Sequence, residues 1–197
     1  MRPEPTYIIS NTNLFAFLND ASKNKLVLTI FWVSMLLFLL LFILVFLKND
    51  LSFLSRLEFT FYGLIIAFMC MPIHEAIHYF TFKKLGARNL KIENYWKRGY
   101  ILTRADKFVV GKKEILPLAT LPFLILSLTG VLFYFLSALP ISISIASAML
   151  LHGSFCQSDF SILAYFFNDK NEKSMVDLFD KDQIHVFVFD KRDKSTN

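Results

Sequence analysis

The distribution of hydrophobic residues along the chain predicts four long apolar helices. An uncharged run covers residues 26–47 between Lys25 and Lys48, and at about 1.5 Å per residue it is long enough to cross a bilayer. Comparable runs follow near residues 57–82, 115–139 and 141–167. The pattern therefore predicts an α-helical integral membrane protein with four transmembrane helices.

One sizeable polar insertion, residues 87–113, separates the second and third apolar runs. It contains short stretches of strand-forming residues separated by charged and glycine-containing turns, which predicts a small β-hairpin or meander. An exposed edge of such a hairpin can receive an extended peptide by strand addition. A basic surface loop with aromatic anchors at the lipid headgroups fits the same residues equally well.

The remaining segments are polar, and only one of them has a strand-like pattern. Residues 1–25 contain a short apolar patch, residues 14–18, that is expected to lie on a membrane surface. The tail, residues 169–197, has one strand-like stretch at 184–189 and no recognisable motif. The predicted organisation is an N-terminal segment (1–25), an anchor helix (26–47), a membrane core (57–168, with the insertion 87–113) and a tail (169–197).

Composition and charge support a membrane protein and its orientation. The 197 residues are 55% hydrophobic with a mean hydropathy of +0.48, which is too apolar for an ordinary soluble domain. The net charge of +5 is therefore interpreted as an orientation signal, with contact to anionic lipid second, and no nucleic-acid partner is expected. With four spans, 19 of the 21 Lys and Arg residues lie on the side of both termini and the insertion. The positive-inside rule puts that side in the cytoplasm.

Candidate chemistry lies near the end of the second apolar run, in His74-Glu75-Ala76-Ile77-His78. On a helix, residues four apart share a face, so His74 and His78 can turn one ring nitrogen each to the same metal ion. Glu75 lies beside them and can polarise a metal-bound water, which is the division of labour in zinc metalloproteases. Histidine and glutamate are also costly within a hydrocarbon layer unless they have a role there.

A catalytic zinc site needs a third protein ligand, and depth in the membrane favours Asp159. His74 lies nine residues before the cytoplasmic end of the second run and Asp159 nine residues before that of the fourth, so both sit roughly 13 Å from the same face. A cation would stabilise an aspartate at that depth. Glu93 and Glu114 are alternative ligands, although both lie at or beyond the membrane edge.

His152 is the third histidine in the apolar runs, about two helical turns deeper than Asp159 if the fourth run is one straight helix. At that depth it is less able to reach the ion, and we consider it as a catalytic residue that hydrogen-bonds the substrate or the oxyanion. Cys70 and Cys156 also lie in apolar runs, where buried thiols are expected. Without a metal, the histidines and Asp159 would make hydrogen bonds between helices.

These residues resemble a known class of enzymes. His74-Glu75-x-x-His78 at the end of a membrane helix, a basic β-like insertion and an aspartate on a later helix are similar to the site-2 proteases, intramembrane zinc metalloproteases. The closer resemblance is to small bacterial membrane proteins called putative zincin peptidases, over about residues 57–168. The segment around Asp159 departs from the site-2 pattern, because His152 stands roughly where that class has an asparagine, and the prolines are missing.

The resemblance implies a multi-pass protein of the bacterial inner membrane that uses Zn²⁺. It makes His74, His78 and Asp159 the metal ligands and Glu75 the general base, and it implies hydrolysis of peptide bonds in a membrane protein or peptide substrate. Two other functions fit the sequence: a metal-stabilised pseudoprotease that binds transmembrane segments, and a small transporter. Because no internal repeat is visible, the transporter is the less favoured. The sequence does not indicate an oligomeric state.

Overall fold

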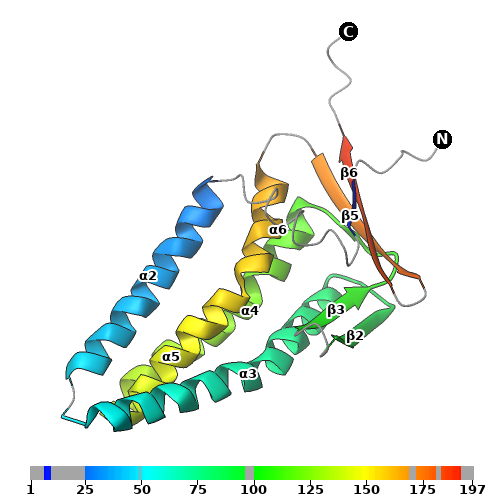
Figure 1. The fold of residues 1–197 in the computed structure, drawn as a ribbon. Helices are drawn as coiled ribbons and strands as arrows, with labels where there is room; N and C mark the ends of the chain where they lie inside the picture. Colours follow the sequence, from blue (N-terminus) through cyan, green and yellow to red (C-terminus); the bar gives the residue numbers. More distant parts are fainter. Residues whose placement is uncertain are drawn as a thin grey trace.

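The fold is seen in a computed structural model that describes residues 7–9, 25–48, 50–95, 100–168, 172–180 and 183–191. Apolar helices form one body, and two small antiparallel sheets lie at one end of it (Figure 1). The helices are α2 (Lys25–Lys48), α3 (Phe53–Lys84), α4 (Lys112–Leu136), α5 (Leu139–Phe155) and α6 (Gln157–Phe167). The predicted apolar patch at residues 14–18 lies outside the described residues.

Three of the predicted apolar runs form single helices, and the fourth is broken. Helices α2, α3 and α4 are each long and apolar enough to cross a membrane, whereas α5 and α6 form a pair that bends by 43° at Cys156. The bend follows the pair Gly153-Ser154, a combination that commonly kinks helices. The described part of the chain thus has three apolar helices of spanning length, or four if the bent pair is one span.

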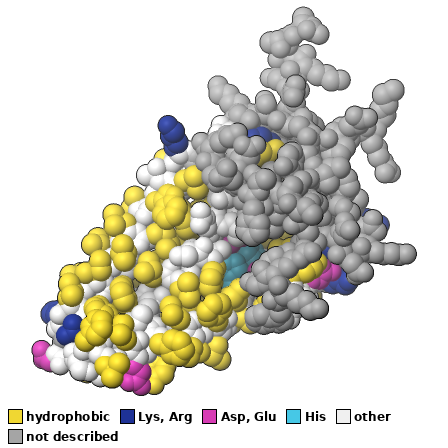
Figure 2. All heavy atoms as spheres, viewed as in Figure 1, with side chains coloured by type: hydrophobic (Ala, Val, Ile, Leu, Met, Phe, Trp, Pro, Cys, Tyr) yellow, Lys and Arg dark blue, Asp and Glu magenta, His cyan; other side chains and the backbone are white. Residues whose placement is uncertain are grey.

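Large apolar side chains cover the outside of the helical body, as Figure 2 shows. Leu54, for example, is 77% exposed, and many leucines and phenylalanines of α2 and α3 are also exposed. A surface of this kind is compatible with lipid as the surrounding solvent. The interior is filled by aromatic and sulfur side chains, among them Phe31, Phe123 and Phe160, whose rings meet at centroid distances of 4.9–6.3 Å.

Small residues at the contact between helices α3 and α5 allow the two backbones to approach closely. Ser144 Oγ donates a hydrogen bond to the carbonyl of Phe59 at 2.6 Å, and Ser147 Oγ donates to the carbonyl of Thr60 at 3.2 Å. A Cβ added at Gly63 would collide with Ser147 Oγ and the carbonyl of Ser144. Small residues at helix contacts are typical of membrane bundles, because they allow the backbones to approach closely.

The polar insertion forms a hairpin of β2 (Leu90–Tyr95) and β3 (Tyr100–Ala105), in which Ile92 is opposite Thr103. This confirms the predicted hairpin, but the last strand-forming stretch of the insertion does not extend it into a meander. That strand, β4 (Val109–Val110), joins the tail instead, in a sheet of order β1-β6-β5-β4. Its other members are β1 (Tyr7–Ile9), β5 (Glu172–Asp180) and β6 (Gln183–Lys191).

The α3–α5 contact generates the first prediction. Gly63→Leu should lower the free energy of unfolding by about 1–3 kcal/mol, because the new side chain has no space between α3 and α5. Thermal unfolding of the detergent-solubilised protein measures the change. Ile65→Phe, an enlargement at a neighbouring exposed position, is the matched control and should have little effect. Equal stability of the two variants would contradict the described packing.

Candidate metal centre

The two motif histidines and Asp159 come together from different helices. His74 and His78 lie one turn apart on α3, and Asp159 lies in the first turn of α6. His74 Nε2 is 2.9 Å from His78 Nε2 and 3.3 Å from Asp159 Oδ2, and His78 Nε2 is 3.7 Å from Asp159 Oδ1. The three side chains therefore converge on one point between α3 and α6.

The carboxylate of Asp159 is largely buried and incompletely satisfied. Its Oδ2 atom has no access to solvent, and no hydrogen bond of acceptable geometry reaches it from the described residues, although His74 Nε2 is close. Burying an ionised carboxylate without a full set of partners is strongly unfavourable. A cation placed between this oxygen and the two imidazoles would remove the penalty.

The separations of the three side chains fit a zinc ion. In a tetrahedral zinc site with bonds of about 2.0–2.1 Å, neighbouring nitrogen and oxygen ligands lie about 3.4 Å apart. The 2.9 Å between the two Nε2 atoms and the 3.3 Å from His74 Nε2 to Asp159 Oδ2 are close to that value, and His78 Nε2 lies 3.7 Å from the other carboxylate oxygen, Oδ1. Two imidazoles and one carboxylate are also a donor set that suits zinc. The residues present therefore fit the metal that the motif implies.

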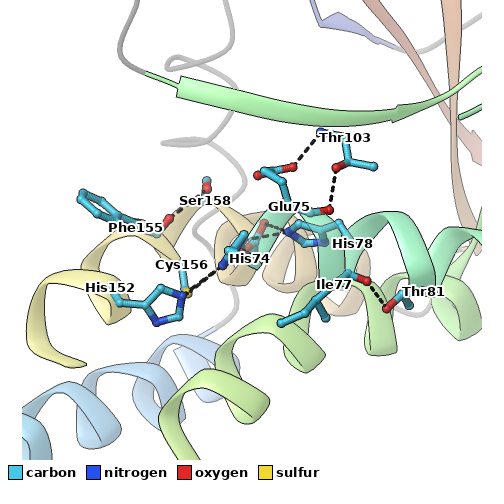
Figure 3. A network of polar contacts seen from close by, with 11 residues as sticks. His74, Glu75, Ile77, His78, Thr81, Thr103, His152, Phe155, Cys156 and Ser158 are labelled. Atoms are coloured by element: carbon cyan, nitrogen blue, oxygen red, sulfur yellow. Dashed lines mark hydrogen bonds and ion pairs between the residues drawn. The ribbon is translucent and has the colours of Figure 1, made fainter. Parts of the chain in front are cut away.

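Glu75 points from the same turn of α3 towards the hairpin (Figure 3). Its Oε2 atom accepts a hydrogen bond of 2.7 Å from the backbone N–H of Thr103 in β3, and its backbone carbonyl accepts one of 2.8 Å from Thr103 Oγ1. Thr103 thus fixes β3 to α3 at the motif and holds the glutamate carboxylate in one place. This residue gave no signal in the sequence.

A buried arginine ties the hairpin to the other sheet. Arg104, which is 3% exposed, donates two hydrogen bonds to Asp177 on β5, at 2.6 and 2.8 Å, and one of 2.9 Å to Glu93 on β2. This bidentate pairing is the geometry for which the guanidinium group is suited. Arg104 follows Thr103 directly, so the network also determines where the partner of Glu75 lies.

The charges of this network shift its pKa values. Burial would raise the pKa of Glu93, but hydrogen bonds from Tyr95 and Arg104 outweigh it and hold that pKa below its ordinary value. Burial and the hydrogen bond to Glu93 raise the pKa of Tyr95 to about 12. Partial burial alone would lower the pKa of Arg104, but the hydrogen bonds and negative charges of Asp177 and Glu93 outweigh burial and hold that pKa above its ordinary value. All three groups therefore keep their ordinary charge states at neutral pH.

His152 and Cys156 lie on the other side of the His74 ring. His152 Nε2 is 3.2 Å from His74 Nδ1, and Cys156 Sγ is 3.8 Å from His74 Nδ1 and 3.7 Å from His152 Nε2. His152 is thus nearer to the centre than a straight fourth helix would place it, because the chain bends between it and Asp159. Cys156 is buried, as predicted, and its spacing of four residues from His152 puts both on one helical face.

A cavity of about 420 Å³ opens beside the cluster. It is lined by the polar residues His74, Glu75, His78 and Asp159, and residues 101–105 of the hairpin strand β3 also border it. Phe68, Met71 and Phe155 contribute apolar surface. An apolar cavity with a few convergent polar groups is the usual form of a small-molecule or peptide site.

The two alternative ligands are occupied elsewhere. Glu93 belongs to the Arg104 network, and Glu114 accepts a hydrogen bond of 2.9 Å from the backbone N–H of Gly111 at the start of α4. Neither belongs to a group of potential metal ligands in the described part of the chain. Of the residues considered from the sequence, the structure therefore brings together His74, His78 and Asp159, with Glu75 and His152 adjacent.

The fold and the cluster define the class: a helical protein with long apolar segments and a candidate metal centre built on a His-Glu-x-x-His helix. The sequence pattern of the family described as putative zincin peptidase matches residues 67–173, more than half of the chain, and the protein belongs to that family. This membership suggests a zinc metallopeptidase. Searches of curated proteins and of solved structures found no significant match.

The arginine network generates the second prediction. Arg104→Met should lower the free energy of unfolding by about 3–5 kcal/mol, because it leaves the carboxylates of Glu93 and Asp177 without their buried partner. Thermal unfolding in detergent measures the loss. Lys91→Met is the control, since Lys91 also pairs with Glu93 but is largely exposed, and such pairs contribute little. If both substitutions cost the same, the Arg104 network does not stabilise the hairpin.

Proposed function

We propose that the protein is a membrane-embedded zinc metallopeptidase of the site-2 type, which hydrolyses peptide bonds in or near the membrane. The observation that carries this proposal is the convergence of His74, His78 and the buried oxygen of Asp159 on one point, with Glu75 next to the first histidine. Membership of a zincin family supports it independently of the geometry.

In this proposal His74 Nε2, His78 Nε2 and one oxygen of Asp159 hold the zinc ion. When bound, zinc supplies a water of pKa about 7 and polarises the carbonyl that is to be cleaved. Glu75 is the general base: its carboxylate takes the proton of the attacking water and later passes it to the leaving amine. The hydrogen bond from the Thr103 N–H keeps this carboxylate oriented while the side chain is otherwise free to accept a proton.

The hairpin provides a place for an extended substrate. One edge of β3 pairs with β2, and the Thr103 N–H points away from β2, towards Glu75. Residues 101–105 also line the cavity. A peptide that lies along this edge of β3, opposite the one that pairs with β2, would pass next to Glu75 and the metal ligands. A helical substrate would have to unwind first, since its carbonyls are otherwise engaged in the helix.

We place the protein in the inner membrane of a bacterial cell, with the sheets and both termini in the cytoplasm. The exposed apolar helices support a lipid environment, and the Lys and Arg residues of the sheet end support this orientation. The substrate would then be a membrane protein or a peptide released from one, and the catalytic water would enter from the cytoplasmic side.

For His152 we propose a positioning role in place of direct contact with the substrate. If His74 binds zinc through Nε2, its Nδ1 carries the hydrogen, and the atom nearest to accept it is His152 Nε2 at 3.2 Å. Such outer partners fix the tautomer and ring orientation of a ligand histidine. His152→Ala should therefore weaken zinc binding by about 10–100-fold, as measured by competition with a chromophoric chelator. Unchanged zinc affinity with reduced kcat would instead favour the role at the oxyanion.

Substitution of the general base tests the proposed reaction. Glu75→Gln should retain zinc, because no ligand is removed and the amide oxygen can still accept from the Thr103 N–H, but it should lower cleavage of a membrane reporter substrate by at least about 100-fold. His74→Ala should lose both metal and cleavage. Metal content of the purified protein and reporter cleavage are measured together. Glu58→Gln, an exposed position on the same helix, is the matched control.

The same two measurements separate the alternatives. Equal cleavage by wild type and Glu75→Gln would exclude the mechanism. Zinc binding without cleavage that depends on Glu75 would favour the pseudoprotease, which binds transmembrane segments without cutting them. Absence of zinc from the wild-type protein would favour the transporter or a helical bundle held together by hydrogen bonds.

A further inference from the structure

A second set of metal-ligand atoms lies on the opposite side of the His74 ring. His74 Nδ1, His152 Nε2 and Cys156 Sγ lie within 4.8 Å of one another, and the three residues come from α3, α5 and the junction between α5 and α6. Cys156 is 0% exposed and unbonded to any other cysteine, and its sulfur contacts the two ring nitrogens. The proposed hydrolysis uses neither Cys156 nor His74 Nδ1 as a ligand.

The separations within this set also match a tetrahedral metal. For two zinc–nitrogen bonds and one zinc–sulfur bond of ordinary length, the nitrogens lie about 3.4 Å apart and each nitrogen lies about 3.6 Å from the sulfur. The observed distances are 3.2 Å between the nitrogens and 3.7 and 3.8 Å to the sulfur. A hydrogen bond between His74 and His152 would by itself explain the 3.2 Å between the nitrogens. It would not explain why the Cys156 sulfur lies at nearly the same distance from both rings.

We propose that His74 Nδ1, His152 Nε2 and Cys156 Sγ form a second metal position, selective for thiophilic divalent ions, that competes with the first position for His74. Binding there displaces the thiol proton to water and leaves a thiolate ligand. A set of two imidazoles and one thiolate favours softer ions than the set that contains Asp159 does. His74 and His152, two of the three ligand residues, line the cavity beside the cluster.

Competition follows from the chemistry of one imidazole ring. A neutral imidazole has one nitrogen with a free lone pair and one that carries hydrogen. With a metal on Nε2, the hydrogen is on Nδ1 and points towards His152; with a metal on Nδ1, it is on Nε2 and points towards His78 and Asp159. Filling the second position therefore removes one ligand from the first. If the proposed function holds, an excess of thiophilic metal inhibits the enzyme in this way.

Cobalt(II) distinguishes the two positions by its spectrum. The full chain in detergent, stripped of metal and kept reduced without added thiol, is titrated with Co²⁺. Only a thiolate ligand gives a sulfur-to-cobalt charge-transfer band in the near ultraviolet, so the band reports the second position alone. It should appear in the wild type and in Cys70→Ala, disappear in Cys156→Ala, and fall at least tenfold in His152→Ala. Asp159→Asn should show a stronger band at saturating cobalt, because less of the bound metal occupies the competing position.

Cys70 is the matched control, because it is the other free cysteine and lies one turn before His74 on α3. A band that survives in Cys156→Ala or vanishes in Cys70→Ala would overturn the proposal, and so would cobalt bound to the wild type without the band. That last result would leave the proposed hydrolysis intact. Conversely, if the band appears but reporter cleavage is the same in wild type and Glu75→Gln, the proposed hydrolysis is refuted and the second metal position is not. The elution volume of each metal-free variant in size-exclusion chromatography verifies that it is folded.

Discussion

The buried charge of Asp159 is the constraint on which the rest of the structure depends. A carboxylate between apolar helices is stable only if cationic or hydrogen-bonding groups face it, and the two nearest such groups are the imidazoles of α3. The chain brings them together with a helix break that starts α6 two residues before Asp159, and with a close α3–α5 contact built on Gly63 and two serines. Helix positions are thus fixed by small residues, while the chemistry is contributed by a few polar ones.

Much of this centre could be predicted because its signals are local. The spacing of His74 and His78 places both on one helical face, and counting residues from the ends of two apolar runs put His74 and Asp159 at one level. Both arguments need only the helical rise and the cost of burying charge. The apolar runs themselves give the bounds of α2 to within one residue and those of α3 and α4 to within four. The hairpin was predictable for the same reason, since its strands are adjacent in the sequence.

The remainder depends on pairings that no local pattern encodes. Arg104 and Asp177 are 73 residues apart, and helices α4, α5 and α6 lie between β4 and β5 in the chain, so neither the network nor the second sheet could be predicted from either segment alone. The tail was expected to hold one strand because the stretch that forms β5, with Lys173 and Asp177 in it, has no clean alternation. The break at Cys156 was missed for another reason: the apolar run continues through it, although Gly153-Ser154 is a known kink site.

That break changes the interpretation of His152 and links the two halves of the site. A straight helix would have left His152 two turns away from the metal ligands, whereas the bend brings its ring to the far side of His74. His74 then has a polar neighbour at each ring nitrogen, so the position of its single hydrogen affects the contacts on both sides of the ring. Whatever occupies one side of the ring determines the tautomer, and the tautomer determines what the other side can bind. The imidazole of His74 is therefore enough to couple the Asp159 carboxylate on α6 to the Cys156 thiol at the end of α5.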